Sequence, residues 1–160
     1  MGPTSKPEFP PLLPGGLHPM GEEELADLCV KRFPLSTSRA PIMAGLREVL
    51  ARLAGVGINA EVWVDGSFLT EKIDPDDVDF AIRLIGTEFD TAPQDVVDAV
   101  VWAVSDLKTS HRVDGYAWAE WPDDHSEHDF GKERRSYWEK WYGTSRGGNP
   151  KGIVVIRLGA

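Results

Sequence analysis

Apolar and polar positions alternate along the chain with two different periods. Apolar residues recur every three or four positions in four segments, which predicts helices there: 21–33, 36–57, 94–107 and 127–143. Apolar and polar residues alternate one by one in four others, which predicts strands: 60–66, 77–85, 111–121 and 152–158. Helices and strands therefore intermix along the sequence. This order predicts a single small α/β (α+β) domain with a mixed β-sheet flanked by helices.

The first twenty residues differ in composition from the rest. They are rich in proline and contain Gly15-Gly16, so a long helix is excluded because proline lacks a backbone donor. We expect a proline-rich N-terminal arm at 1–20 that packs on one domain at 21–160.

The composition and charge of the chain indicate where the protein acts and what it does not bind. No apolar run approaches the roughly 20 residues that span a bilayer, and the N-terminus lacks the pattern of a secretory signal, so we expect a cytoplasmic protein without a membrane partner. The net charge of −9 disfavours binding to bulk duplex DNA. The single cysteine, Cys29, lies among apolar residues at helical spacing and is expected to be a buried hydrophobe.

A Gly-Ser pair ends the first predicted strand. Gly66 lets the backbone approach a phosphate because it has no Cβ. Ser67 offers a hydroxyl and an amide, and at the start of a short helix it would also contribute a positive dipole end. Taken alone the pair is typical of a turn; joined to the carboxylates that follow, it is a candidate phosphate cradle.

Two aspartates mark the start of the second predicted strand. Asp77 and Asp79 alternate with Val78, so both are expected on one face of the strand. Carboxylate oxygens at this spacing suit one or two Mg²⁺ ions. Such ions would hold the oxygens of a triphosphate during phosphoryl or nucleotidyl transfer.

The spacing of these parts carries a resemblance. Gly66-Ser67, nine residues and Asp77-Val78-Asp79 resemble the Gly-[Gly/Ser], nine to thirteen residues, Asp-x-[Asp/Glu] pattern of the nucleotidyltransferase superfamily, which includes DNA polymerase β and the antitoxin-type minimal nucleotidyltransferases. The wider chain, with NPKGIVVIRL near its end, is similar to a small uncharacterised bacterial family described as nucleotidyltransferase-like.

The resemblance implies roles for individual residues. Asp77 and Asp79 would bind Mg²⁺ (or Mn²⁺), and Gly66 and Ser67 would hold the triphosphate. The superfamily has a third carboxylate on a later strand, for which Asp114 is the candidate; it would bind metal and help to deprotonate the attacking hydroxyl.

The chain departs from the superfamily pattern beside the Gly-Ser. Asp65 precedes it where an apolar residue is usual, and Phe68 follows it where Arg is common. Lys72 is the candidate to supply the missing positive charge to the nucleotide.

The resemblance leads to two functional hypotheses. The first is a minimal Mg²⁺-dependent nucleotidyltransferase that moves a nucleotidyl group from a nucleoside triphosphate to a protein, an RNA or a small molecule. A chain this short has little room for an acceptor domain, so the acceptor is expected to come with a partner protein or to bind between copies of the chain. The alternative is a weakly active or inactive nucleotidyltransferase-like module in a toxin–antitoxin or phage-defence system.

Other polar clusters have simpler explanations. His125 and His128 could bind a transition metal, but a charged loop entering a helix accounts for them better. The predicted helix 127–143 carries aromatics beside basic residues; these could hold a nucleobase or an RNA end, although core packing and a solvated face are the commoner explanation. Arg146 and Lys151 could reach phosphates, although a turn also explains their segment.

Overall fold

The computed structural model describes residues 7–159, which form a single α+β domain with a five-stranded mixed sheet and six α-helices. The strands are β1 (Gly16–Pro19), β2 (Ala60–Asp65), β3 (Val78–Ile85), β4 (Val113–Glu120) and β5 (Gly152–Leu158). Their order across the sheet is β1-β5-β2-β3-β4. The pairs β1–β5 and β3–β4 are parallel, whereas β2 is antiparallel to both neighbours. The predicted mixed sheet is confirmed.

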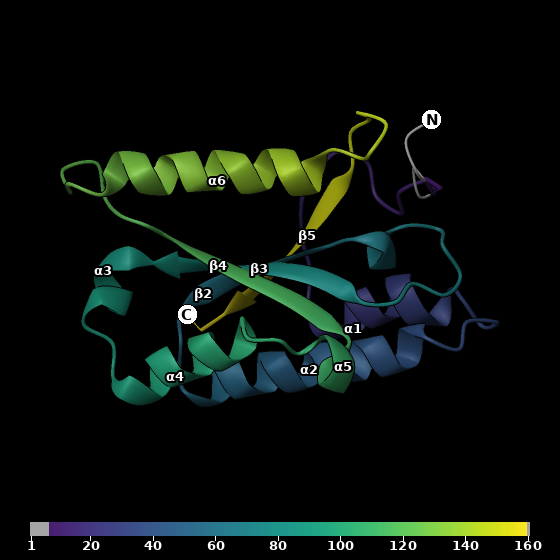
Figure 1. The fold of residues 1–160 in the computed structure, drawn as a ribbon, viewed down its shortest axis with the longest axis horizontal. Coiled ribbons are helices and arrows are strands. Elements are labelled where there is room, and N and C mark those ends of the chain that lie inside the picture. Colours follow the sequence, from purple (N-terminus) through teal and green to yellow (C-terminus); the bar gives the residue numbers. More distant parts are fainter. Residues whose placement is uncertain (1–6, 160) are drawn as a thin grey trace.

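Helices cover both faces of this sheet (Figure 1). The α-helices are α1 (Glu22–Ala26), α2 (Arg39–Gly55), α3 (Gly86–Asp90), α4 (Gln94–Ala103), α5 (Lys108–His111) and α6 (His128–Gly143). A π-helical segment, Asp27–Lys31, follows α1, and a 3-10 turn, Ser67–Leu69, follows β2. Figure 1 shows α6 alone above the sheet, with α1, α2, α4 and α5 below it.

Two apolar clusters hold these layers together. The larger lies between the sheet and α2, with α1 and α4 beside it; Leu46, Val62 and Phe80 are fully buried in it. The smaller lies under α6 and is mostly aromatic, comprising Trp63, Ala81, Trp118, Trp138, Tyr142, Ile153 and Val155. Strand β3 sends Phe80 to one cluster and Ala81 to the other, as its alternation predicts.

The proline-rich segment contributes to the sheet. Strand β1 pairs with β5, and Pro11 forms a bridge with Thr70. Gly16–Pro19, within the predicted arm at 1–20, is thus an edge strand of the same sheet, while the division between that arm and a domain at 21–160 stays a prediction. Four residues in a proline-rich stretch give too little alternation to reveal a strand. The part of the predicted arm at 1–6 lies outside the described residues.

Most predicted elements are present within a few residues of their expected ends. The helices α3 and α5 were not predicted, because four or five mostly polar residues show no apolar period. Cys29 is fully buried, as predicted, and burial raises the pKa of its thiol to about 12. No helix in residues 7–159 combines the length and apolarity needed to cross a membrane.

Candidate active site

Three aspartates lie side by side across neighbouring strands. Asp65, the last residue of β2, is opposite Asp79 on β3, and Asp79 is in register with Asp114 on β4. Neighbouring strands are about 4.8 Å apart, and residues in register project to the same face. The strand pairing thus brings the predicted Asp79 and Asp114 together and adds Asp65 to the row, on the face of the sheet that α6 covers.

Gly66 directly follows β2 and lies against this row of aspartates. Its φ of 92° and ψ of −168° belong to a region that only glycine occupies readily. A Cβ at this position would lie 2.7 Å from Asp79 Oδ2. The backbone turn before Ser67 therefore passes directly against the carboxylate, which places the predicted phosphate cradle and the predicted metal ligands in one site.

Substituting Gly66 by alanine tests this contact. We expect Gly66→Ala to lower the free energy of unfolding by about 2–4 kcal/mol, because backbone strain adds to a clash with Asp79. Gly57→Ala is the matched control: its φ of 74° is also positive, but no atom lies within 4 Å of the added Cβ. Urea unfolding of both variants measures the difference, and an equal loss at the two positions would contradict the close approach.

Burial and mutual repulsion raise the pKa values of two of these carboxylates, Asp65 and Asp79. Burial, followed by the charges of Asp77 and Asp114, raises the pKa of Asp79 to about 7. Burial likewise raises the pKa of Asp65 to about 7, even though Lys151 acts to lower it. Clustered carboxylates with raised pKa values are costly in a folded protein and are typical of functional sites.

Two lysines neutralise part of this charge. Lys151, just before β5, places Nζ 3.0 Å from Asp65 Oδ1 and donates a hydrogen bond to the Gly66 carbonyl at 3.0 Å. Lys108, at the start of α5, places Nζ 3.6 Å from Asp114 Oδ2. The site therefore contains a positive group at each end of the carboxylate row.

Two tyrosines adjoin the row from α6 and β4. The Tyr142 side chain is buried, and its hydroxyl has no hydrogen-bond partner among residues 7–159. Burial, and then the charges of Asp79, Asp65 and Asp114, raise the pKa of Tyr142. Tyr116 donates a long hydrogen bond of 3.5 Å to Asp114 Oδ2. Tyr142 thus supplies a buried donor beside the carboxylates.

Asp77 lies immediately before β3 and belongs electrostatically to the same site. Its charge raises the pKa of Asp79, and it raises that of Lys108 together with Asp114. The donor set is all oxygen, which is the type Mg²⁺ prefers. Among residues 7–159, no group of three or more His, Cys, Asp or Glu side chains is arranged so that it could hold a metal ion. The fit to Mg²⁺ thus rests on donor type and on the shared face.

Buried side chains hold the segment that follows Gly66-Ser67 in place. Phe68 is fully buried, so this position, where the superfamily commonly has Arg, belongs to the core. Arg39 is also fully buried and donates hydrogen bonds to the carbonyls of Phe68, Thr70 and Lys72. The Lys72 ammonium lies 6.0 Å from the centre of the Phe9 ring. Lys151 and Lys108 are the lysines that contact the aspartate row, whereas the role predicted for Lys72 stays a prediction.

A pocket opens beside the carboxylate row. It has a volume of about 650 Å³ and is lined by Asp114, Tyr116 and Lys108 and by the segment from Val104 to Leu107. Pockets of 300–1,000 Å³ are large enough for a small-molecule ligand. The space next to Asp114 falls within this range of volumes.

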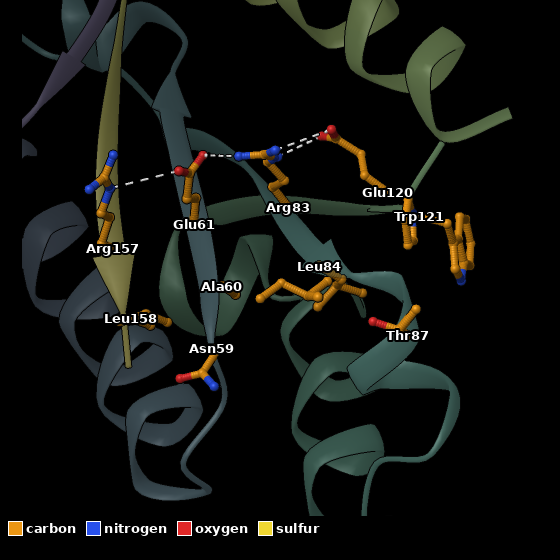
Figure 2. A pocket seen from close by; sticks show the side chains of 12 residues that line it. Asn59, Ala60, Glu61, Arg83, Leu84, Thr87, Glu120, Trp121, Arg157 and Leu158 are labelled. Carbon is orange, nitrogen blue, oxygen red and sulfur yellow. Dashed lines mark hydrogen bonds and ion pairs between the residues drawn. The ribbon is translucent and has the colours of Figure 1, made fainter. Parts of the chain in front are cut away.

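A second pocket lies at the opposite ends of the same strands, with a volume of about 540 Å³. Figure 2 shows a row of charged side chains across it, from Arg157 through Glu61 and Arg83 to Glu120. Arg83 bonds both glutamates, at 3.1 Å to Glu61 and 2.6 Å to Glu120. These charges largely satisfy one another, so this pocket is the weaker candidate for an active site.

The histidines near α6 have local roles. His125 Nδ1 accepts a hydrogen bond from the Glu127 amide. His128 begins α6, with Nδ1 2.9 Å from the Trp121 carbonyl oxygen and Nε2 3.4 Å from Asp123. These contacts agree with the interpretation of a charged loop that enters a helix.

Comparison with known proteins places this geometry in a family. A model described as a family of unknown function, DUF6932, matches residues 7–157. The chain belongs to this family. No curated protein and no solved structure gives a significant match. The DUF6932 match covers every helix described above, strands β1 to β4 and all of β5 except Leu158, and it includes all four aspartates.

Sequence reasoning missed part of this candidate site. Asp65 was noted only as a departure from the superfamily pattern, yet the register of β2 and β3 places it in the row. Lys151 was named as a residue that could reach phosphates, but its contact with Gly66 was not predicted: the two lie 85 residues apart in sequence, and the pairing of β5 with β2 brings them together. Tyr142 carried no local signal, because a tyrosine at helical spacing is typical of a core.

Proposed function

We propose that this domain is a Mg²⁺-dependent nucleotidyltransferase that transfers a nucleotidyl group from a nucleoside triphosphate to an acceptor. The observation that carries the proposal is the register that brings Asp79 and Asp114 together beside Gly66-Ser67. A carboxylate row next to a glycine turn is the combination that nucleotidyl transfer requires.

Each group has a role in the proposed reaction. The acceptor hydroxyl oxygen attacks the α-phosphorus, a new P–O bond forms, and the bond to the bridging oxygen breaks, so that pyrophosphate leaves. Asp77, Asp79 and Asp114 would hold Mg²⁺, which when bound would neutralise the triphosphate oxygens and lower the barrier to in-line attack. Asp114, beside the pocket, would accept the proton of the acceptor hydroxyl.

The lysines would complete the triphosphate site. Lys151 holds the Gly66 carbonyl, so its ammonium is next to the position proposed for the β- and γ-phosphates. It would supply the positive charge that the superfamily places after the Gly-Ser. Because Lys151 already neutralises Asp65, the extra carboxylate need not repel the nucleotide.

Calorimetric titration of each nucleoside triphosphate in Mg²⁺ and in EDTA tests the site. We expect binding by the wild type in Mg²⁺ only, and at least a tenfold weaker affinity in Asp77→Asn/Asp79→Asn, because the metal ligands are lost. Asp76→Asn is the control, since Asp76 is an exposed neighbour outside the row. Binding that is indifferent to the metal and to the double substitution would contradict the proposal.

One observation favours a second function. Lys151 pairs with Asp65 and Lys108 pairs with Asp114, so the protein's own cations partly balance the carboxylate row. This is also the arrangement expected of a nucleotidyltransferase-like binding or regulatory module, for example in a toxin–antitoxin or phage-defence pair. Complete absence of nucleotide binding in the titration would favour the module.

A further inference from the structure

The outer flank of α6 exposes an unusual set of aromatic side chains. Tyr137 is 45% exposed and Trp141 is 66% exposed. Together with Arg134, they recur at three- and four-residue intervals and so share one flank of the helix. The neighbouring flank packs on the sheet through Trp138 and Tyr142. We call Tyr116, Arg134, Tyr137 and Trp141 the aromatic surface.

The side chains of the aromatic surface contact one another and are connected to the carboxylate row. The rings of Tyr137 and Trp141 are nearly parallel, at 7°, with centroids 6.2 Å apart, and the Arg134 guanidinium lies 4.4 Å above Tyr137. The centroid of the Trp138 ring lies 5.0 Å from that of Tyr137 and 5.1 Å from that of Tyr116. Tyr116 in turn bonds Asp114. Ring contacts therefore connect Tyr116, beside the proposed reaction centre, to Tyr137 on the outside of α6 through the buried Trp138.

Local charge favours an anionic ligand for this surface. The whole chain has a net charge of −9, but Phe130 to Arg146 contains five Lys or Arg and two Glu. Exposed aromatics within a positively charged segment are the usual means of binding single-stranded nucleic acid, since bases stack on rings while cations meet phosphates. The acidic remainder of the chain would repel a long polyanion elsewhere.

We infer that the aromatic surface binds the 3′ end of a single-stranded nucleic acid, with its terminal hydroxyl directed toward Asp114. The inference rests on the proposed function, for which it identifies the acceptor class. Stacking on Tyr137 and Trp141 holds the last bases, and Tyr116 guides the terminal nucleotide to the pocket beside Asp114.

The test is fluorescence anisotropy with 5′-labelled eight-nucleotide U and dT oligomers, at low salt in EDTA and without nucleotide. We expect binding by the wild type, and a loss of affinity of about 5- to 100-fold in both Trp141→Ala and Tyr137→Ala. Leu35→Ala is the control, because Leu35 is an 82% exposed apolar side chain outside this surface and the segment around it. Circular dichroism checks that each variant is folded. A preference between the two oligomers identifies RNA or DNA as the acceptor.

The outcomes separate this inference from the proposed transfer. Asp77→Asn/Asp79→Asn should still bind the oligomers, because it leaves the aromatic surface intact. Oligomer binding that depends on Trp141 supports the inference even if no triphosphate binds. Absence of binding by the wild type, or equal binding by Trp141→Ala, overturns it. Sedimentation gives a further overturning result: self-association that Trp141→Ala abolishes, with no oligomer bound, would assign the surface to a second copy of the chain.

Discussion

Replacing Arg39 by methionine is expected to lower the free energy of unfolding by about 3–5 kcal/mol. The guanidinium is fully buried and donates to four carbonyls: Cys29, Phe68, Thr70 and Lys72. Methionine fills much of the volume but leaves buried acceptors without donors, each of which costs about 1–3 kcal/mol. Because three of these carbonyls belong to the segment after Gly66-Ser67, the cradle should loosen as well.

Urea unfolding followed by tryptophan fluorescence measures this effect. Arg52→Met is the matched control: Arg52 lies on the same helix and stacks on Trp102, but it is exposed, so we expect a change within about 1 kcal/mol. Arg39→Lys should fall between the two, since an ammonium has three donors and no planar fork. A loss below about 1 kcal/mol in Arg39→Met would show that the carbonyls find other donors.

Replacing Asp79 by asparagine is expected to stabilise the protein at pH 8. The pKa of Asp79 is raised to about 7 in the folded protein, from an ordinary 3.8. The folded state therefore binds more protons than the unfolded state between these values, so this group's contribution to stability falls as pH rises from about 4 to 7. Asparagine removes the charge, and we expect a gain of about 2–4 kcal/mol at pH 8 that disappears near pH 4.

The control for Asp79 has the opposite sign. Asp74 accepts hydrogen bonds from the Thr37 and Ser38 amides and the Ser36 hydroxyl, and these lower its pKa. Its contribution is present above about pH 4 and is lost as pH falls through its lowered pKa, so Asp74→Asn should destabilise at neutral pH. Thermal unfolding from pH 4 to 8 measures both variants. A loss of stability in Asp79→Asn at pH 8 would show that the carboxylate is well satisfied in the fold.

These two residues show what the sequence can and cannot reveal. The alternation around Asp79 predicted its strand and its face, because local periodicity determines which way a side chain points. Its place beside Gly66 was expected only from the resemblance to the superfamily pattern. Arg39 gave no such signal, since its four acceptors come from segments 10 to 33 residues away. Asp65 became a member of the site only through the register of β2 with β3. Long-range pairing, not composition, decides such contacts.

The helices and strands also differ in whether the sequence could predict them. The amphipathic helices α2, α4 and α6 and the strands β2 to β5 have strong periods and were predicted. Strand β1 has four residues and is held in the sheet by its pairing with β5. Helix α5 packs closely against α2, because a Cβ on Gly45 of α2 would collide with the His111 carbonyl of α5. Short elements of this kind depend on tertiary contacts that a sequence pattern does not contain.

The most direct test of the proposed active site is transfer of label from nucleoside triphosphates carrying ³²P at the α-phosphate. The reaction contains Mg²⁺ or Mn²⁺ and, as acceptors, the chain itself and a single-stranded oligomer with a free 3′-hydroxyl. We predict that the wild type transfers α-label but not γ-label, and that Asp77→Ala/Asp79→Ala loses at least about a thousandfold in rate, since the metal ligands are removed. Transfer at the wild-type rate by the double variant would contradict the assignment of these carboxylates.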